Sequence, residues 1–356
     1  YVFTSERNDA PVLAFRLLAS GVRVGLSNRP IEAGGRDYPR GTYIVRVGRN
    51  DTTVHGIVER LARETGVEVV GINTAFSERA QFGVGSESVY DLRVPSVALV
   101  GEEGVSVPGY GAAWYVLEQR YGIPFTPVAA RWLAGGDLSR FNVIIVPDGS
   151  AATLNRLLGD AGATRLRDWV RSGGTLVTFG GASSWAAREN VNLTSARIVG
   201  ADAKPDSAAG TRADTSAAAR RRAEDDVLAV TSPSMTTGRP ASLPGSHFDA
   251  VLDRTHWLTS GFEDQRITAL MEGSTFLTLS KEGANIAVFP STGRLHRAGF
   301  VWPENTERLL RNSALVIEEP TGGGHVVLFA NDPWFRAWWH ALDKLVLNAI
   351  VLGPSF

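Results

Sequence analysis

Residues that could bind a ligand follow directly after several short apolar runs of the chain. In an open α/β sheet, ligands settle in the crevice outside the carboxyl ends of the strands, so polar residues at these places are the first candidates for a site. The candidates are Glu102, Glu103, Asp148, Gly180, Gly181, Ser183, Ser184, Asn331 and Asp332. If the runs are parallel strands, the acidic groups converge on one rim, where they could hold a divalent cation or a basic group of a ligand. The alternative is that these carboxylates cap helices and loops.

Ser183 and Ser184 are the hydroxyl groups that a covalent mechanism would use. They follow Gly180-Gly181, which reads as a sharp turn from a strand into a helix. The G-x-S-x-G pattern of hydrolases is missing from this turn, and none of the six histidines stands in a local arrangement that nominates it as the base. We therefore expect Ser183 or Ser184 to cap the helix, and a serine hydrolase is the less favoured alternative.

The sequence lacks the residues and motifs that thiol or zinc chemistry requires. Cysteine is absent, which excludes a thiolate nucleophile, a disulfide and a thiolate metal site. The zinc motifs H-E-x-x-H and H-x-x-E with a later histidine are absent too, and His55-x-x-x-Glu59 has the wrong spacing. The glycines at 322–324 lack the Lys-Ser/Thr of a phosphate loop and predict a turn. We expect no catalytic residue, metal ligand or cofactor within this segment.

The composition is that of an ordinary globular protein. The 36 basic and 37 acidic residues give a formal net charge of −1, which offers no broad attraction for nucleic acid or an anionic membrane. No apolar run approaches the roughly 18 residues that would suggest a membrane span. The sequence begins at Tyr1, in what already looks like a strand. We therefore expect the chain to be a fragment of a larger polypeptide.

The elements that would position the candidate residues fall into two domains. Residues 1–76 predict a βαββαβ domain, with strands at 1–4, 22–26, 41–47 and 67–72 and helices at 9–20 and 53–65. Residues 77–95 are rich in glycine and serine and predict a connector. Residues 96–356 predict a doubly wound α/β domain. Its parallel strands are expected at 97–100, 125–128, 143–146, 176–179 and 326–330, and its helices at 110–121, 163–172 and 335–351.

Two further segments interrupt this second domain. Residues from about 200 to 245 form a low-complexity insertion with too little apolar material to pack deeply. Its arginines at 220–222 beside the acids at 224–226 indicate a solvated segment or, alternatively, a basic docking site. After it, strands at 276–279, 286–289, 299–302 and 314–319 predict an antiparallel extension.

Aromatic residues crowd the start of the last predicted helix. On a helix, the adjacent Trp338 and Trp339 would point about 100° apart, so that one faces the sheet and the other a neighbouring surface. The alternative is a stacking platform for a sugar or a peptide.

Several segments taken together resemble the C-terminal region of bacterial zinc carboxypeptidases of the carboxypeptidase A-like superfamily. They are residues 82–86, 94–99, 114–122, 166–174, 182–190, 253–258 and 324–330. The resemblance implies a class I glutamine amidotransferase-like (flavodoxin-like) second domain. In that family the sharp strand-to-helix turn, the elbow, lacks a working nucleophile, which agrees with Gly180-Gly181-Ala182 at this place in the sequence. The resemblance also implies a secreted or periplasmic parent metallocarboxypeptidase, with zinc in an N-terminal peptidase domain that would be the partner of this segment.

We therefore expect a non-catalytic accessory region of a protein whose proteolytic activity, the release of C-terminal residues, resides elsewhere. Its role would be structural support, substrate presentation or self-association. One alternative is a binding module for a peptide or glycan that uses the crevice and the tryptophans. Another is a homo-oligomeric or filamentous scaffold, built through edge strands after Gly245 and an apolar C-terminal helix.

Overall fold

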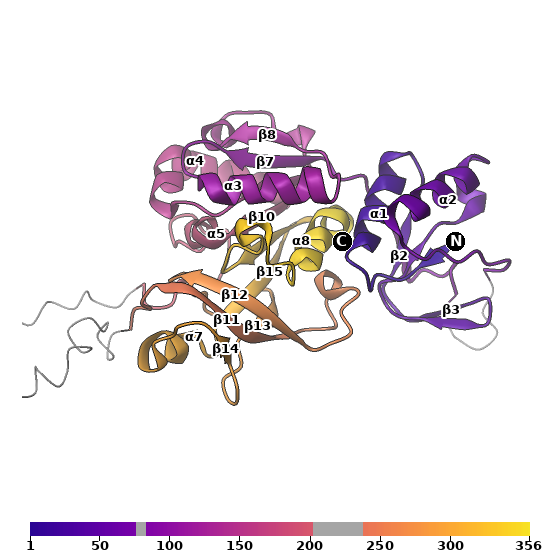
Figure 1. Cartoon of the computed structure of the whole chain (residues 1–356). Coiled ribbons are helices and arrows are strands. Elements are labelled where there is room, and N and C mark those ends of the chain that lie inside the picture. The colour runs from indigo at the N-terminus through magenta and orange to yellow at the C-terminus, as the bar shows by residue number, and fades with distance from the viewer. Residues whose placement is uncertain (76–82, 202–237) are drawn as a thin grey trace, which may run out of the picture.

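The computed structural model describes residues 1–75, 83–201 and 238–356 (Figure 1). Most of the predicted insertion at about 200–245, including the arginines at 220–222, lies outside the described residues, as does part of the connector predicted at 77–95. None of the helices within the described ranges is both long and apolar enough to cross a lipid bilayer.

The N-terminal sheet has the split βαβ arrangement that the sequence predicts. Its order is β1-β5-β2-β6 with antiparallel neighbours, and Val70 forms a bridge to Val2 on the outer side of β1. The sheet carries the helices α1 and α2, which contact each other. The elements are β1 (Val2–Phe3), α1 (Asp9–Ala19), β2 (Gly25–Ser27), β5 (Tyr43–Ile44), α2 (Val54–Thr65) and β6 (Val89–Asp91). Strand β6 comes from the segment expected as connector, and residues 67–72 supply one bridge instead of a strand.

A short hairpin of this domain was not predicted. It consists of β3 (Ile31–Ala33) and β4 (Arg36–Tyr38), joined through Gly34 and Gly35. Both glycines have positive φ, as a tight two-residue hairpin turn requires.

The large sheet has a parallel half with the strand order β8-β7-β9-β10-β16. Numbered along the chain this is 2-1-3-4-5, the flavodoxin-like order. The strands are β7 (Val97–Gly101), β8 (Thr126–Ala129), β9 (Val143–Val146), β10 (Thr175–Phe179) and β16 (Gly324–Phe329). The predicted fold class is therefore confirmed: a small α/β domain is followed by a doubly wound domain with an antiparallel extension.

The antiparallel extension continues the same sheet beyond β16, in the order β15-β13-β11-β12. Its strands are β11 (Leu243–Leu252), β12 (Arg266–Gly273), β13 (Ala284–Val288), β14 (His296–Ala298) and β15 (Ala314–Thr321). Strands β13 and β15 match predicted strands, whereas β11 and β12 were not predicted. The strand expected at 276–279 is reduced to bridges made by Leu277, and β14 ends before the strand expected at 299–302.

The helices of the second domain differ in places from the prediction. Within the described residues they are α3 (Val107–Trp114) with a π-helical continuation (Tyr115–Arg120), α4 (Ala151–Arg171), α5 (Gly180–Ala186), the short α7 (Arg308–Leu310) and α8 (Asp343–Leu352). The helix expected at 335–351 is wrong in its first half. Arg336 and Ala337 have positive φ, so residues 335–337 form only a short 3-10 turn, η7 (Phe335–Ala337), and α8 begins at Asp343. Trp338 and Trp339 therefore lie outside any helix.

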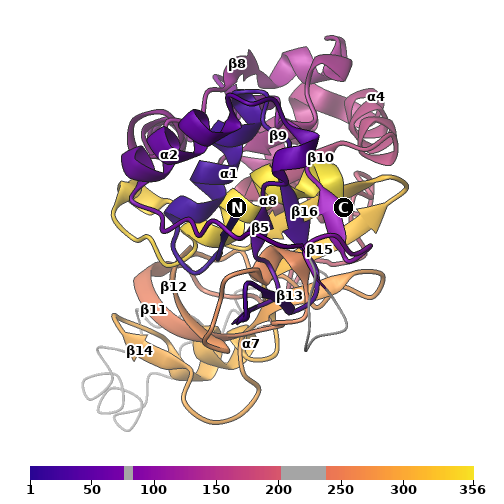
Figure 2. The same cartoon turned by 90° about the vertical axis from the view of Figure 1, so that its right-hand side faces the viewer.

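The two domains share one hydrophobic core. Buried residues of α1, such as Leu13 and Leu17, belong to the same cluster as those of α8 and of the parallel strands. In Figure 2, where the small domain faces the viewer, α1 lies in front of α8, which it contacts. All ten residues of α8 are buried.

Candidate functional site

A pocket of about 360 Å³ opens at the carboxyl ends of β9, β10 and β16. This is the rim where ligands bind in open α/β sheets. The wall comes from the loops after these strands, from the start of α3, from β12 and from η7. Of the nine candidate residues, this pocket brings together Asp148, Gly180, Gly181, Asn331 and Asp332.

The elbow between β10 and α5 carries glycine where a nucleophile would stand. Gly180 has φ 49°, a conformation typical of the strained strand-to-helix turn on which hydrolases mount their reactive side chain. A Cβ atom added at Gly180 would lie 2.3 Å from Oδ1 of Asp148. That oxygen also accepts a hydrogen bond of 2.7 Å from the backbone N–H of Gly181, a group that in such elbows stabilises an oxyanion. The Asp148 carboxylate thus fills the space of a nucleophile and occupies its oxyanion donor.

Neither serine of the elbow has the predicted capping role. Helix α5 already begins at Gly180, so Ser183 and Ser184 lie inside it and the N-cap is Phe179. The Ser183 side chain is fully buried, and its hydroxyl lies 2.9 Å and 2.7 Å from the carbonyl oxygens of Thr178 and Phe329. Ser183 therefore joins α5 to the sheet.

Ser184 points away from this buried contact. Its Oγ lies 3.0 Å from Oγ1 of Thr275, in the segment that follows β12. Neither serine is among the residues that line the pocket.

Glu102 and Glu103 do not join the pocket, contrary to the expectation that all the acidic groups converge. Glu102 is paired with Arg131 at 3.3 Å, and Glu103 with Arg156 at 2.5 Å. The hydrogen bond from Arg156 lowers the pKa of Glu103. Glu103 lines a separate shallow hollow beside the start of α4. Both glutamates are exposed and paired with arginines on the surface.

Three carboxylates line the pocket, and their pKa values are all raised. Burial raises the pKa of Asp332 to about 7; the amide of Trp334 opposes this shift, and the charges of Asp148 and Glu272 add to it. Burial also raises the pKa of Asp148, against the amides of Gly181 and Gly149. Perturbed carboxyl groups that cluster in a cleft are typical of functional sites.

Glu272 is the member of this group that sequence reasoning missed. It lies on β12, a strand that was not predicted, and no local motif marks it. Burial raises its pKa, the neighbouring charge of Asp148 adds to the shift, and Arg336 opposes it. Arg336, at the positive φ of η7, is the one cation among the pocket-lining residues.

Within the described ranges, no group of three or more His, Asp or Glu side chains is arranged to hold a metal ion. The pocket carboxylates surround a space that is large enough for an organic group.

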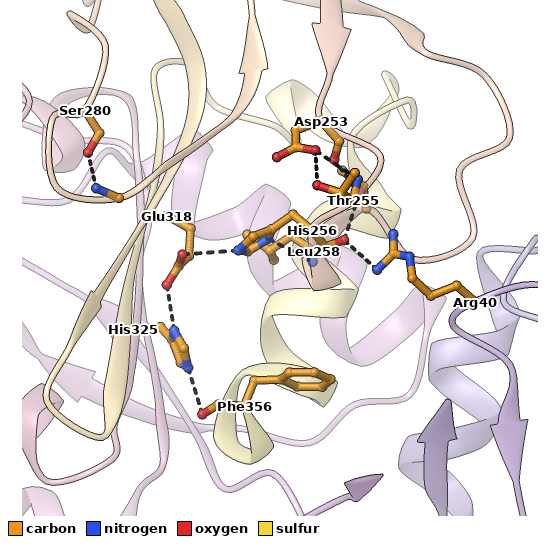
Figure 3. A network of polar contacts seen from close by, with 11 residues as sticks. Arg40, Asp253, Thr255, His256, Leu258, Ser280, Glu318, His325 and Phe356 are labelled. Atoms are coloured by element: carbon orange, nitrogen blue, oxygen red, sulfur yellow. Dashed lines mark hydrogen bonds and ion pairs between the residues drawn. The ribbon is translucent and has the colours of Figure 1, made fainter. Parts of the chain in front are cut away.

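A second polar cluster lies away from the pocket and connects the two domains (Figure 3). The buried Glu318 of β15 lies 2.6 Å from Nδ1 of His325 and 3.2 Å from Nε2 of His256. Arg40, from the small domain, donates to the backbone oxygens of His256 and Arg254. Sequence reasoning found no arrangement among these histidines, because their partners lie far apart in the chain.

No protein-family model and no curated protein matches the chain. Solved structures with similarity include a cytoplasmic protein from Salmonella typhimurium, which is 12% identical with a TM-score of 0.42, covering 72% of this chain and 97% of that one. PurLQS from Thermotoga maritima is 12% identical with a TM-score of 0.44, covering 72% and 97%. A glutamine amidotransferase from Thermotoga maritima is 6% identical with a TM-score of 0.41, covering 72% and 96%. The assignment to the flavodoxin-like folds rests on the strand order 2-1-3-4-5.

Proposed function

We propose that this chain is a non-catalytic accessory region of a larger zinc carboxypeptidase-like protein, and that it presents or retains a peptide or glycan ligand in the pocket at the strand ends. The observation that carries the proposal is the elbow. Gly180 offers no nucleophile, and the Asp148 carboxylate accepts from the amide that an acyl-transfer reaction would need. What remains at the rim is a pocket with charged and aromatic walls, which suits binding.

The accessory role is supported by the resemblance of segments spread over nearly the whole chain. In that reading the zinc, the proteolytic activity and the release of C-terminal residues belong to an N-terminal peptidase domain, and the parent is secreted or periplasmic. This segment would then contribute structural support, substrate presentation or self-association.

The reading frame that precedes Tyr1 tests the accessory role. We expect it to encode a peptidase domain with an H-x-x-E motif and a later histidine, the ligands of a catalytic zinc ion. An upstream sequence without these ligands would contradict the accessory role and leave the binding role standing.

Activity assays test the non-catalytic part of the proposal. The purified chain, incubated with glutamine, p-nitrophenyl acetate or hippuryl-phenylalanine and with zinc added, is expected to give no turnover above the uncatalysed rate. A fluorophosphonate probe is expected to leave Ser183 and Ser184 unlabelled. Turnover or labelling that disappears in Ser183→Ala or Ser184→Ala would overturn the proposal and restore the serine hydrolase.

Binding is tested by intrinsic tryptophan fluorescence. Phe335 and Arg336 of η7 line the pocket, and Trp334 and Trp338 stand directly before and after η7. Titration with alanine and lysine tripeptides and with chitotriose is expected to change the emission for at least one of these probes. The matched control is Asp148→Asn, which alters the pocket and leaves every tryptophan in place.

One observation favours self-association as a second function. Strand β12 stands at the end of the large sheet, and within the described chain its outer edge pairs with no other strand. The side chains of Asn331 and Trp339 bind the carbonyl oxygens of Leu270 and Thr268 on this edge, so a partner strand would have to displace them. The C-terminal helix cannot contribute, because α8 is wholly buried, contrary to the expectation that its apolar face is available. Light scattering at increasing concentration would detect association, and Thr268→Pro in β12 is expected to abolish it.

A further inference from the structure

We propose that the pocket binds an aliphatic ammonium or guanidinium group, held between the carboxylates of Asp148, Glu272 and Asp332. The inference deepens the proposed binding function, on which it rests, by naming the chemical class of the ligand.

The charge of the pocket is negative and unbalanced. The three carboxylates come from three separate elements: the loop after β9, strand β12 and the loop after β16. Nothing in the described part of the chain forms an ion pair with any of them, whereas the nearby Glu102 and Glu103 each have an arginine partner. A bound cation would supply the missing counter-charge.

Arg336 offsets only part of the carboxylate charge, since its guanidinium lowers the pKa of Glu272. Its Cζ lies 5.1 Å from the centre of the Phe335 ring, which is the geometry of a cation–π contact. The carboxylates outnumber this one guanidinium among the pocket-lining residues. The site therefore keeps a negative charge that favours a cation.

Asn331 gives a second and independent sign of a ligand. It lines the pocket and is only 3% exposed. Its Nδ2 donates to the backbone oxygen of Leu270, but within the described chain its Oδ1 has no hydrogen-bond partner. Buried acceptors are nearly always satisfied in folded proteins, so an N–H donor of a ligand is the expected partner of this oxygen.

The shape of the pocket favours an organic cation over a metal ion. No set of three ligating side chains in the described ranges converges closely enough for a metal. The volume of about 360 Å³ is that of a small-molecule pocket. Pro108, Leu270 and Phe335 provide apolar surface for a methylene chain that ends in the charged group.

The protonation of the pocket adds a pH dependence. Burial and the charges of Asp148 and Glu272 raise the pKa of Asp332 to about 7, while the amide of Trp334 opposes the shift and Arg336 lowers the pKa of Glu272. A bound cation favours the ionised carboxylate, so binding near neutral pH releases a proton. The affinity is therefore expected to rise about tenfold between pH 6 and pH 8.

Isothermal titration calorimetry on the full chain tests this inference. The probes are Nα-acetyl-lysine amide, Nα-acetyl-arginine amide and the neutral Nα-acetyl-norleucine amide, with cadaverine as a free amine and with calcium and magnesium chloride as metals. We expect binding of at least one cationic amide or of cadaverine, and none of the norleucine compound or the metals. Stronger binding of the amides assigns the source as a basic side chain of a peptide; stronger binding of cadaverine assigns a free amine.

Variants locate the binding in the pocket. Asp148→Asn and Glu272→Gln are expected to weaken it at least tenfold, and Asp332→Asn to remove its pH dependence. The exposed Glu59→Gln on α2 is the control for loss of one negative charge. Glu272 is exposed and makes no internal hydrogen bond in the described chain, so its variant keeps the test valid if Asp148→Asn fails to fold.

The outcomes separate this inference from the function on which it rests. Binding of norleucine amide as tight as that of the cations, tight binding of a metal, or cation binding unchanged in the variants would overturn the cationic ligand. If chitotriose or trialanine binds in the pocket and no cation does, the cationic ligand falls and the binding function stands. If no probe binds, both fall.

Discussion

At the scale of single residues, the contact between Asp148 and Gly180 decides what the elbow can do. A side chain at position 180 faces two costs: a positive φ and the carboxylate oxygen that already occupies its place. Glycine removes both, and the same oxygen then holds the start of α5 through the amide of Gly181. The absence of a nucleophilic side chain at position 180 and the position of the Asp148 carboxylate therefore depend on each other.

A substitution series separates the two costs at Gly180. Gly180→Ala is expected to lower the free energy of unfolding by about 3 kcal/mol, because it combines left-handed strain with a steric overlap. Gly21→Ala is the matched control, since Gly21 also has a positive φ but has open space around its Cβ position. It should cost only about 1–2 kcal/mol. In urea denaturation, the double variant Gly180→Ala/Asp148→Gly should have a higher unfolding free energy than the sum of the two single losses predicts, because the overlapping carboxylate is gone. Strictly additive losses would contradict the overlap between a Cβ at position 180 and Asp148.

The pair of Glu318 and His325 has a defined pH window. Burial alone would lower the pKa of His325, but the hydrogen bond that its Nδ1–H donates to Glu318 raises the pKa above 6.5. The stabilising contribution of His325 is therefore full below pH 6.5 and is lost as pH rises through the folded pKa. For Glu318, burial would raise the pKa, but the hydrogen bonds from His256 and His325 lower it below 4.5. The stabilising contribution of Glu318 is therefore present above pH 4.5 and is lost as pH falls through the folded pKa.

Glu318→Gln should therefore be most harmful near pH 6. Breaking a buried ion pair costs about 3 kcal/mol, and the loss should be smaller at pH 9, since His325 loses its charge as pH rises through its folded pKa. The measurement is the unfolding free energy of the variant and the parent chain at both values of pH. A loss that does not change with pH would show that the pair acts only through packing.

At the scale of elements, the parallel strands could be predicted from the sequence, because β7, β9 and β10 are nearly unbroken apolar runs buried on both faces. Strand β11 could not, since Pro244, Gly245 and Asp249 interrupt it. These residues are tolerated by a bulge after Leu243 and by the ion pair of Asp249 with Arg297. The bulge and the ion pair both depend on tertiary contacts, which cannot be predicted from a local sequence pattern.

The residues of the candidate site likewise fall into those that the sequence could predict and those that it could not. Asp148, Asn331 and Asp332 could be placed because each directly follows a predictable strand. Glu272 could not be predicted as a site residue, because it lies on β12, a strand that the sequence did not predict. Glu102 and Glu103 were wrongly predicted to join the pocket, because their arginine partners could not be known from the sequence. The aromatic segment before α8 also misled the helix prediction: Trp339 is fixed by a hydrogen bond from its Nε1 to the Thr268 carbonyl of β12.

The start of α4 tests how far local capping holds an element in place. The Ser150 hydroxyl accepts from the N–H of Thr153 at 3.2 Å. Ser150→Ala should lower the unfolding free energy by about 1 kcal/mol, and Ser150→Asn, which keeps a capping oxygen, should lower it by far less. Equal losses in chemical denaturation would mean that the cap does not stabilise the helix.

At the scale of the whole molecule, polar contacts as well as the shared core join the two domains. The Lys344 ammonium of α8 donates to the backbone oxygens of Glu6, in the small domain, and Gly261, in the large one. Gly41 and Gly261 allow the two backbones to approach closely, against Ser260 and Ser5. The partners of Arg40 lie more than 200 positions along the chain, which is why sequence analysis could not anticipate this interface.

Lys344 makes the stability of the whole molecule depend on pH. Burial lowers its pKa from 10.5 to about 8, so the unfolded chain binds more protons between these values, and stability rises with pH across that window. Relative to Lys344→Met, the parent chain should gain about 2 kcal/mol between pH 7 and pH 9.5. Parallel pH profiles in denaturant titrations would contradict the assigned burial.

The continuous core has a practical consequence for anyone who cuts the polypeptide. Trypsin acting at the exposed Arg93, between the last strand of the small sheet and the first of the large one, would sever the covalent link yet leave α1 packed on α8. The nicked molecule should elute from a sizing column as one species and separate into two bands only under detergent. The halves are thus poor candidates for independent expression, and joining either to a foreign partner would uncover the apolar surface that the other now shields.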